Sequence, residues 1–402
     1  MPAFRPFSAA RALAVLALAV LAACGEEPVV DRGPFAAVCS EAGVICTVAG
    51  DGAAGLGALG RPAWQQSLYL PMDVAFDGEG SVYVVDWNNH RAIRLGEGGE
   101  ALAYAGSGEL GGLPGGGSKA TEAAIYHPTD LVFRPEGGAW IALWHNDAVA
   151  AIGQDGAFAL VAGNGDAGLV GDGTDASTAA LGLPSKIARR PSDGALCFTE
   201  AQGHRVRCVE AGVLRTIFGP GGSEDVGPGF GGDGGPGTDA RLALPDGNSA
   251  VPAGGLCFRS DGALLVADTL NHRIRMLDSN GTVTTVAGSG PTHADPLEPG
   301  APIGDGGPAT AARLLHPTDV ACAADGGFVI ADRDHDCVRA VDGEGVIHTV
   351  AGRCGERGAD GDGGPATAAR LNRPYGVALH PDGRLFVADT HNHRVRRLRL
   401  GP

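Results

Sequence analysis

Short apolar runs separated by polar turns recur along the chain and predict β-strands rather than helices. Residues 264–290 show the pattern most clearly. An apolar run (264–267) and a polar turn come first, then an alternating segment (273–277), a Ser-Asn-Gly turn and a β-branched run (282–287). A further strand is expected just before them, at 255–259. One repeat is therefore a four-stranded antiparallel meander, which must stack on copies of itself to bury both faces.

Acidic residues that end the second strand mark six copies of this unit. They recur at similar intervals, and a His-Arg pair follows most of them. A motif like Val-Ala-Gly then closes every copy except the last. The markers are Asp86, Glu200, Asp268, Asp332 and Asp389, with Trp144 expected in the equivalent place of a degenerate copy.

The missing fourth strand of the last copy is found at the other end of the chain. The sequence ends at RVRRLRLGP, whereas VICTVAG at residues 44–50 looks like a fourth strand without the three that should precede it. We expect this N-terminal strand to complete the last copy. Six units then close into a ring that leaves no open interface. The sequence thus predicts an all-β fold, a six-bladed β-propeller over residues 44–402.

The repeated pattern Val-Ala-Asp-x-x-Asn-His-Arg, followed by Thr-Val-Ala-Gly, resembles the NHL repeat. The resemblance covers most of the chain and implies a six-bladed propeller, which agrees with the strand count. It implies no single function, because relatives include binding scaffolds, receptor modules and a minority of metal-dependent lyases.

The first residues have the features of an export signal. Within residues 1–23, Arg5 and Arg11 precede an apolar run that is too short to cross a bilayer as a stable helix. Leu-Ala-Ala-Cys resembles the lipobox of bacterial lipoproteins, so we expect an acylated Cys24 followed by a tether over residues 24–43. Gly25 after that cysteine favours anchoring in the outer membrane of the cell envelope. The alternative is an ordinary cleaved signal that ends near a cysteine.

The net charge of the chain disfavours some classes of binding partner. It carries 30 basic and 46 acidic residues, a formal net charge of -16. Nucleic acid and anionic lipid surfaces are therefore disfavoured, and the lipid anchor is the one membrane contact expected. The sequence contains no Gly-x-Ser-x-Gly, phosphate loop or His-Glu-x-x-His motif, so enzyme classes with such local signatures are not supported.

Eight of the nine cysteines remain once Cys24 is set aside, an even number that suits disulfides in an oxidising compartment. The first candidate pair flanks a single predicted turn, and two others are close in sequence. These candidates are Cys197 with Cys208, Cys39 with Cys46, and Cys337 with Cys354. Cys257 and Cys322 are left over on first strands of neighbouring units. A zinc site is the alternative, although no Cys-x-x-Cys pair is present.

Long loops join successive units, and three of them share Gly-Asp-Gly-Gly-Pro at 232–236, 304–308 and 361–365. The glycines suit turns with positive φ, and the proline suits the start of a short helix such as 309–314. A calcium-binding loop is the alternative. By strand parity, these loops emerge at the same end of the ring as the acidic turns. This long-loop face comprises residues 51–69, 107–126, 164–182, 220–252, 289–315 and 353–372.

The start of each inner strand offers the sharpest site hypothesis. Asp73, Asp130 and Asp319 occupy equivalent positions just after a proline, and His127 and His316 directly precede two of these prolines. Carboxylates brought together by the ring would raise one another's pKa or hold a divalent cation such as calcium. The sequence therefore predicts a ligand or metal site at the mouth of the central channel. Capping of local backbone amides is the alternative role of these aspartates.

The acidic residues that recur in the repeats have a simpler explanation. Because they follow the period of the fold, we expect them to bond turn amides and the neighbouring blade, with arginines pairing nearby. We therefore favour a non-enzymatic binding scaffold that takes a protein, peptide or glycan on the long-loop face. The alternatives are a metal-dependent lyase or hydrolase at the channel mouth and a purely structural envelope component. Whether the insertion at 220–252 is a docking element is left open.

Overall fold

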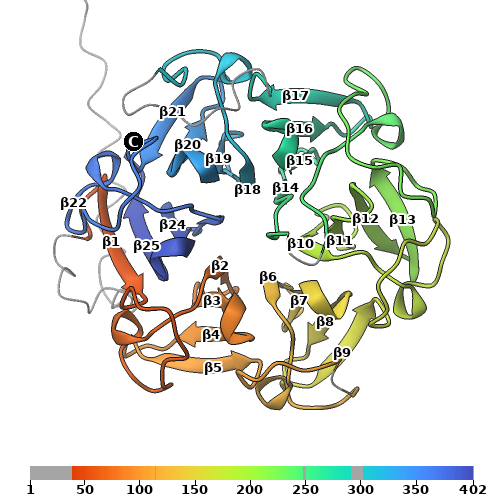
Figure 1. Cartoon of the computed structure of the whole chain (residues 1–402), viewed down its shortest axis with the longest axis horizontal. Coiled ribbons are helices and arrows are strands. Elements are labelled where there is room, and N and C mark those ends of the chain that lie inside the picture. Colours follow the sequence, from red (N-terminus) through yellow and green to blue (C-terminus); the bar gives the residue numbers. More distant parts are fainter. Residues whose placement is uncertain (1–38, 114, 248–249, 291–301, 402) are drawn as a thin grey trace, which may run out of the picture.

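The structure, a computed structural model, describes residues 39–113, 115–247, 250–290 and 302–401. Six antiparallel sheets surround a central axis and form a closed ring (Figure 1). The helical segments in the described part of the chain are single 3-10 turns. The prediction of an all-β, six-bladed propeller is confirmed.

Each blade is a meander whose first strand lies nearest the axis and whose fourth lies at the rim (Figure 1). Blade 1 comprises β2 (Pro71–Phe76), β3 (Val82–Asp86), β4 (Arg91–Leu95) and β5 (Ala101–Ala105). Blade 2 comprises β6 (Pro128–Phe133), β7 (Ala139–Leu143), β8 (Ala148–Ile152) and β9 (Phe158–Ala162). Blade 3 comprises β10 (Pro184–Arg189), β11 (Leu196–Glu200), β12 (Arg205–Glu210) and β13 (Val213–Phe218).

The remaining blades follow the same order. Blade 4 comprises β14 (Leu256–Phe258), β15 (Leu264–Asp268), β16 (Arg273–Leu277) and β17 (Val283–Ala287). Blade 5 comprises β18 (Pro317–Cys322), β19 (Phe328–Asp332), β20 (Cys337–Val341) and β21 (Ile347–Ala351). Blade 6 comprises β23 (Gly376–Leu379), β24 (Arg384–Asp389), β25 (Arg394–Arg399) and the N-terminal strand β1 (Val44–Ala49), with the short β22 (Gly364–Pro365) at its edge.

Short 3-10 turns occupy two kinds of place. Those after the second strands are η3 (Trp87–Asn89), η5 (Trp144–Asn146), η8 (Thr269–Asn271), η11 (Arg333–His335) and η13 (Thr390–Asn392). Those in the loops between blades are η2 (Ala63–Gln65), η4 (Ala120–Glu122), η6 (Ala176–Thr178), η7 (Gly237–Asp239), η10 (Ala309–Ala311) and η12 (Ala366–Ala368). The helix expected at 309–314 is therefore a single turn.

The N-terminal strand closes the ring as predicted. β1 runs antiparallel to β25, with Ile45 opposite Leu398 and Cys46 opposite Arg397. Ile45 and Leu398 are buried in one apolar cluster with residues of blade 5 such as Val329. Because the outer strand of blade 6 comes from the start of the chain, the last blade and the first segment stabilise each other.

One expected position shifts by a residue. Pro128 pairs with Leu143 in the way that Pro71 pairs with Asp86. Leu143 therefore takes the place of the acidic marker in blade 2, and the assignment of Trp144 to that place was wrong. The blade lacks the carboxylate that aligns the other copies, so only the strand register identifies the equivalent residue.

Neighbouring blades are joined by a repeated hydrogen bond. In all six blades, the residue that ends the turn after the second strand has a left-handed conformation, with φ between 45° and 55°. Its side chain accepts the N–H of the residue that precedes the inner-strand proline, or its equivalent, in the next blade. The acceptors are His90, Asp147, His204, His272, Asp336 and His393. Asp147 and Asp336 thus perform in two blades the task of histidine in the others, because both side chains tolerate this conformation and supply an acceptor.

Four disulfides cross-link the described residues. The three predicted pairs are present, and Cys257 of blade 4 pairs with Cys322 of blade 5. The predicted signal segment (1–23), Cys24 and most of the tether lie outside the described residues. Within the described ranges, no helix combines the length and the apolar character needed to cross a bilayer.

Candidate functional site

The centre of the ring is held by an ion cluster. The third residue of the inner strands is Asp73 on β2, Asp130 on β6, Lys186 on β10 and Asp319 on β18, and all four are buried. The Lys186 Nζ lies 2.6 Å from Asp73 Oδ2 and 3.0 Å from Asp319 Oδ2. The three predicted aspartates therefore converge, and the cation between them belongs to the chain itself.

The same carboxylates also bind backbone amides. In each aspartate, Oδ1 accepts the N–H of the next residue in its own strand, at 2.7 to 3.0 Å. Asp130 Oδ2 accepts the N–H of Ile187 at 2.7 Å, and Asp319 Oδ2 accepts the N–H of Val377 at 3.1 Å. These two bonds connect inner strands of successive blades, so the cluster closes the ring at its axis.

Burial controls the protonation of this cluster. Burial raises the pKa of Asp73 to about 8; the ammonium of Lys186 opposes this shift and the Asp130 carboxylate adds to it. Burial likewise raises the pKa of Asp319 to about 6. Burial disfavours the charged form of Lys186, but the carboxylates of Asp319 and Asp73 outweigh it and raise its pKa above its usual range. At neutral pH a charged ammonium therefore sits beside a protonated Asp73.

The cluster does not fit a divalent cation. The described residues contain no group of three or more His, Cys, Asp or Glu side chains arranged to hold a metal ion. The place expected for calcium between Asp73, Asp130 and Asp319 is filled by the ammonium of Lys186. Lys186 stands at the same depth on β10 as the aspartates on their strands, and its long side chain reaches them across the axis.

The two histidines assigned to the channel mouth belong to other groups. His127 stacks on Trp87 with ring centroids 4.2 Å apart, and its Nδ1 lies 2.5 Å from His145 Nδ1. His316 instead places its Nδ1 2.7 Å from Asp334 Oδ2. Burial lowers the pKa of His127 to about 3, and the neighbouring imidazoles lower it further. The predicted set of three carboxylates and two histidines is therefore divided among three places.

The repeated acidic residues are structural, as expected. In blade 4, Asp268 accepts the N–H of Ala243 from the entering loop and an ion pair from Arg275 at 3.1 Å. Arg275 is fully buried and also pairs with Asp233 at 2.7 Å, whose other oxygen accepts from the Thr285 hydroxyl. The equivalent buried arginine is the third residue of the third strand in blades 4, 5 and 6: Arg275, Arg339 and Arg396.

The Gly-Asp-Gly-Gly-Pro loops supply the other half of this arrangement. Asp233, Asp305 and Asp362 each pair with a buried arginine and accept a threonine hydroxyl. Asp172 pairs with Arg207 and accepts from Thr216 in the same way in blade 3. These aspartates therefore lock each connecting loop onto a blade, which supports the structural interpretation over a calcium-binding loop.

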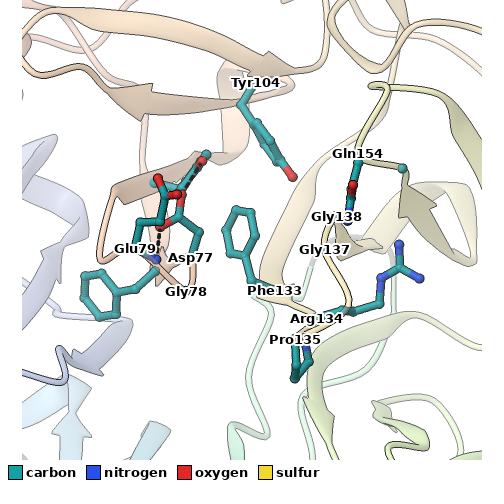
Figure 2. A pocket seen from close by; sticks show the side chains of 13 residues that line it. Asp77, Gly78, Glu79, Tyr104, Phe133, Arg134, Pro135, Gly137, Gly138 and Gln154 are labelled. Carbon is teal, nitrogen blue, oxygen red and sulfur yellow. Dashed lines mark hydrogen bonds between the residues drawn. The ribbon is translucent and has the colours of Figure 1, made fainter.

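Two hollows of ligand size open on the surface of the described residues. One, of about 820 Å³, lies between blades 1 and 2 and is lined by the turns after β2, β6 and β8, at the end opposite the long-loop face (Figure 2). The other, of about 520 Å³, lies on the long-loop face, where Leu110, Leu113, Tyr126 and His145 contribute to its lining. Both volumes fall within the range of small-molecule sites.

Most exposed apolar side chains lie on the long-loop face; Leu59 is the exception, because the residues after it pair with Glu100 and Ala101 at the opposite end of blade 1. All seven large hydrophobic residues that are exposed in the described part of the chain lie in loops between blades or in a turn after a second strand. They are Leu56, Leu59, Tyr69, Leu110, Val226, Phe230 and Leu270. Such residues on one face of a ring are typical of an interaction surface.

Comparison with known proteins identifies an NHL repeat in the chain and partial similarity to larger proteins. The NHL repeat family matches residues 371–398, which contain β23, β24 and β25. The chain is 34% identical over 137 residues to the protein SUPPRESSOR OF QUENCHING 1, chloroplastic, of Arabidopsis thaliana, covering 34% of this chain and 12% of that protein. It is 26% identical over 367 residues to teneurin-1 of Homo sapiens, covering 84% of this chain and 12% of that protein. This chain therefore spans about an eighth of the length of either relative.

Solved structures share the fold at low identity. An auxiliary nutrient binding protein from Bacteroides thetaiotaomicron VPI-5482 superposes with a TM-score of 0.59 and 15% identity, covering 88% of this chain and 75% of the other. At that identity the likeness concerns the fold alone. Together with the six sheets and the family match, it leads to one conclusion: the chain is a six-bladed β-propeller that carries an NHL repeat at residues 371–398.

Proposed function

We propose that the protein is a non-enzymatic binding scaffold that takes a partner protein or peptide on its long-loop face. The observation that carries this proposal is the gathering of most of the exposed large hydrophobic residues of the described chain on that face. The hollow beside Leu110 and Tyr126 gives this face a concave anchor point. The insertion at 220–252 contributes Val226 and Phe230, so it belongs to the docking surface.

Arginines of β16 and of the insertion hold the insertion in a defined conformation. Arg273 lies 4.0 Å from the centroid of the Phe230 ring, and Arg275 lies 4.8 Å from it. Arg241 donates to the backbone carbonyl groups of Val226 and Gly227. Phe230 is therefore held on the surface rather than left to bury itself, which is the property expected of a preorganised contact residue.

The scaffold is held at the bacterial cell envelope in this proposal. The lipobox-like sequence before Cys24 supports acylation of that cysteine and anchoring in the outer membrane. The tether would then leave the propeller free to meet its partner. The acidic charge of the chain favours a partner with a neutral or basic surface.

Catalysis at the channel mouth receives less support. A metal-dependent lyase or hydrolase would need an open cation position with histidines near it. Here the ammonium of Lys186 takes that position, and His127 and His316 contact other groups. The axis of the ring is thus better suited to holding the inner strands together.

Site-specific photocrosslinking in the producing cells tests the docking face. A benzophenone amino acid replaces Leu110 or Phe230, and the matched controls carry it at Glu97 or Glu344, exposed residues in turns at the opposite end. We expect one discrete crosslinked partner from the first two positions and none from the controls. Binding of that purified partner should weaken at least tenfold in Phe230→Ser. Equal crosslinking from both ends, or no crosslinking at all, would refute the proposal.

A further inference from the structure

The larger hollow, on the face opposite the proposed docking surface, has an aromatic wall. Tyr83, Tyr104 and Phe133 contact one another, with ring centroids 4.4 to 5.6 Å apart. Tyr83 is buried, whereas Tyr104 and Phe133 are partly exposed in the cleft. Figure 2 shows Tyr104 directed toward Phe133, with Asp77 and Glu79 on one side and Arg134 and Gln154 on the other.

The aromatic wall occurs at only one of the six blade junctions of the described residues, although the blades are repeats of one another. The strand pairing defines the positions equivalent to Tyr83, Tyr104 and Phe133 at the other five blade junctions. At those junctions the trios are Trp140, Val161 and Arg189; Cys197, Ile217 and Phe258; Leu265, Val286 and Cys322; Val329, Val350 and Leu379; and Phe386, Val48 and Phe76. None of them has three aromatic rings. A feature that the fold required would recur with the repeat, so this one points to a local role.

Hydrogen-bond acceptors lie on both sides of the aromatic wall. The Tyr83 hydroxyl donates to Asp77 at 2.9 Å, and Asp77 also accepts two turn amides, so this carboxylate is satisfied and its ring is fixed. Glu79 is exposed and offers a carboxylate acceptor. On the opposite side, the Gln154 amide group donates to Glu136 O, which leaves its own carbonyl oxygen as an acceptor.

Arg134 provides donors on that second side. Its contacts within the described residues are long: 3.5 Å to Ile152 O and 3.9 Å to Glu136. Its Nε is buried and has no hydrogen-bond partner among the described residues. In the described part of the chain its Nη atoms hold only the two long contacts, so the guanidinium at the edge of the cleft can donate charge-assisted hydrogen bonds to a ligand.

Two glycines allow this arrangement. Gly137 and Gly138 have φ of 95° and 73°, which ordinary side chains rarely adopt. A Cβ on Gly137 would collide with the Gln154 amide, and one on Gly138 would collide with Ile152 O and approach Arg134 Nη2 within 2.7 Å. The turn after β6 therefore packs closely against the turn after β8 and positions both polar side chains at the cleft.

We infer that this cleft is a saccharide-binding site. An apolar ring wall bordered by a carboxylate, a guanidinium, an amide carbonyl and a phenol hydroxyl matches a ligand with one apolar face and hydroxyl groups on its edge, which is the form of a sugar ring. A wholly apolar ligand would remove Arg134 and Glu79 from water without replacing their hydrogen bonds. The volume of about 820 Å³ accommodates a short oligosaccharide.

The test applies the protein, purified from producing cells, to an array of neutral and acidic saccharides of one to six rings. Calorimetric titration with the strongest binder then compares wild type with Tyr104→Val. Valine stands at this position in four other blades, as Val48, Val161, Val286 and Val350, so the variant keeps the fold. We expect at least tenfold weaker binding, and a several-fold loss in Gln154→Ala, since that residue is exposed and outside the core.

Tyr69→Val is the matched control, because it makes the same change at an exposed tyrosine on the long-loop face. It should bind the saccharide as wild type does, and all variants should melt within a few degrees of wild type. Absence of binding to every saccharide up to ~10 mM, a very weak limit on the affinity scale, would overturn the inference. Unchanged affinity in both Tyr104→Val and Gln154→Ala would overturn it as well.

Discussion

Replacing Lys186 by methionine tests the role of the central ion cluster. The substitution keeps the length and most of the apolar stem of the side chain but removes the one cation between Asp73 and Asp319. At 3.0 Å, and with an effective dielectric of 20, the contact of the ammonium with the ionised Asp319 carboxylate corresponds to about 5–6 kcal/mol of Coulomb attraction, and the protonated Asp73 adds a hydrogen bond at 2.6 Å. Most of that attraction is offset by desolvation, so removal of the partner is expected to cost about 3–5 kcal/mol.

The loss should be visible as a lower melting temperature. With an unfolding entropy of about 2.1 cal/mol/K for each of ~350 residues, a loss of 3–5 kcal/mol lowers the midpoint by about 4–7 °C. Lys119→Met is the matched control, since Lys119 is exposed and forms an ion pair with the exposed Glu122 at 3.5 Å. Its midpoint should move by less than about 1 °C.

The pH dependence gives the prediction a second, independent signature. The folded-state pKa values of Asp73, about 8, and Asp319, about 6, lie above the model value of 3.8. These groups therefore contribute stability that is fully present below about pH 4 and is lost as the pH rises through 6 and then 8. Without the ammonium, both pKa values rise further, so Lys186→Met should lose more at pH 8 than at pH 4.

Scanning calorimetry of the wild type, Lys186→Met and Lys119→Met at pH 4, 6 and 8 makes the comparison. Asp73→Asn added to Lys186→Met should restore part of the loss at pH 8, because it removes one unpaired buried carboxylate. If Lys186→Met and Lys119→Met had the same melting temperature at every pH, the ammonium would not hold the inner strands together, and the reasoning would be refuted.

Further substitutions test the disulfides, the close packing at the axis and the acylation predicted at Cys24. Cys322→Ser opens a disulfide that spans 65 residues and joins two blades, and Cys208→Ser opens one that spans 11. Chemical unfolding should show that the free energy of unfolding falls by about 4 kcal/mol in the first variant and about 3 kcal/mol in the second. The reverse order would contradict the loop-entropy account. Gly376→Ala should lower the melting temperature, because a Cβ there would collide with Met72 O, whereas Gly78→Ala has open space and should leave it unchanged. Cys24→Ser should abolish labelling by radioactive fatty acid in producing cells, and undiminished labelling would exclude this cysteine as the acylation site.

Local signals in the sequence predicted the fold well. The alternation of apolar and polar residues, the turn glycines and the recurring acidic markers each act over a few residues, so the number of blades and their strands could be read without knowledge of contacts. The outer strand of blade 6 could also be assigned to the start of the chain, because Val44–Gly50 repeats a motif that the last copy lacks. The single misplaced marker, Trp144 instead of Leu143, falls where the local signal is missing.

Disulfides were predictable to the extent that they are local. Cys197 and Cys208 face each other across one turn, in directly paired positions of β11 and β12. Cys257 and Cys322 lie on different blades, and their pairing depends on how blade 4 stacks on blade 5. Distance along the chain therefore marks the limit of what the pattern alone predicts.

The sequence by itself determined the repeat, the closure of the ring and the structural role of the recurring aspartates, because each follows from short-range pattern and period. The tertiary structure decided the sites. The equivalence of Lys186 with Asp73, Asp130 and Asp319 was visible in the sequence, but only the width of the closed ring brings its ammonium within 3.0 Å of two of them. The same holds for Tyr83, Tyr104 and Phe133, whose rings meet between two blades although each looks like an ordinary strand residue. Convergence of this kind depends on packing between units, which no local pattern of residues contains.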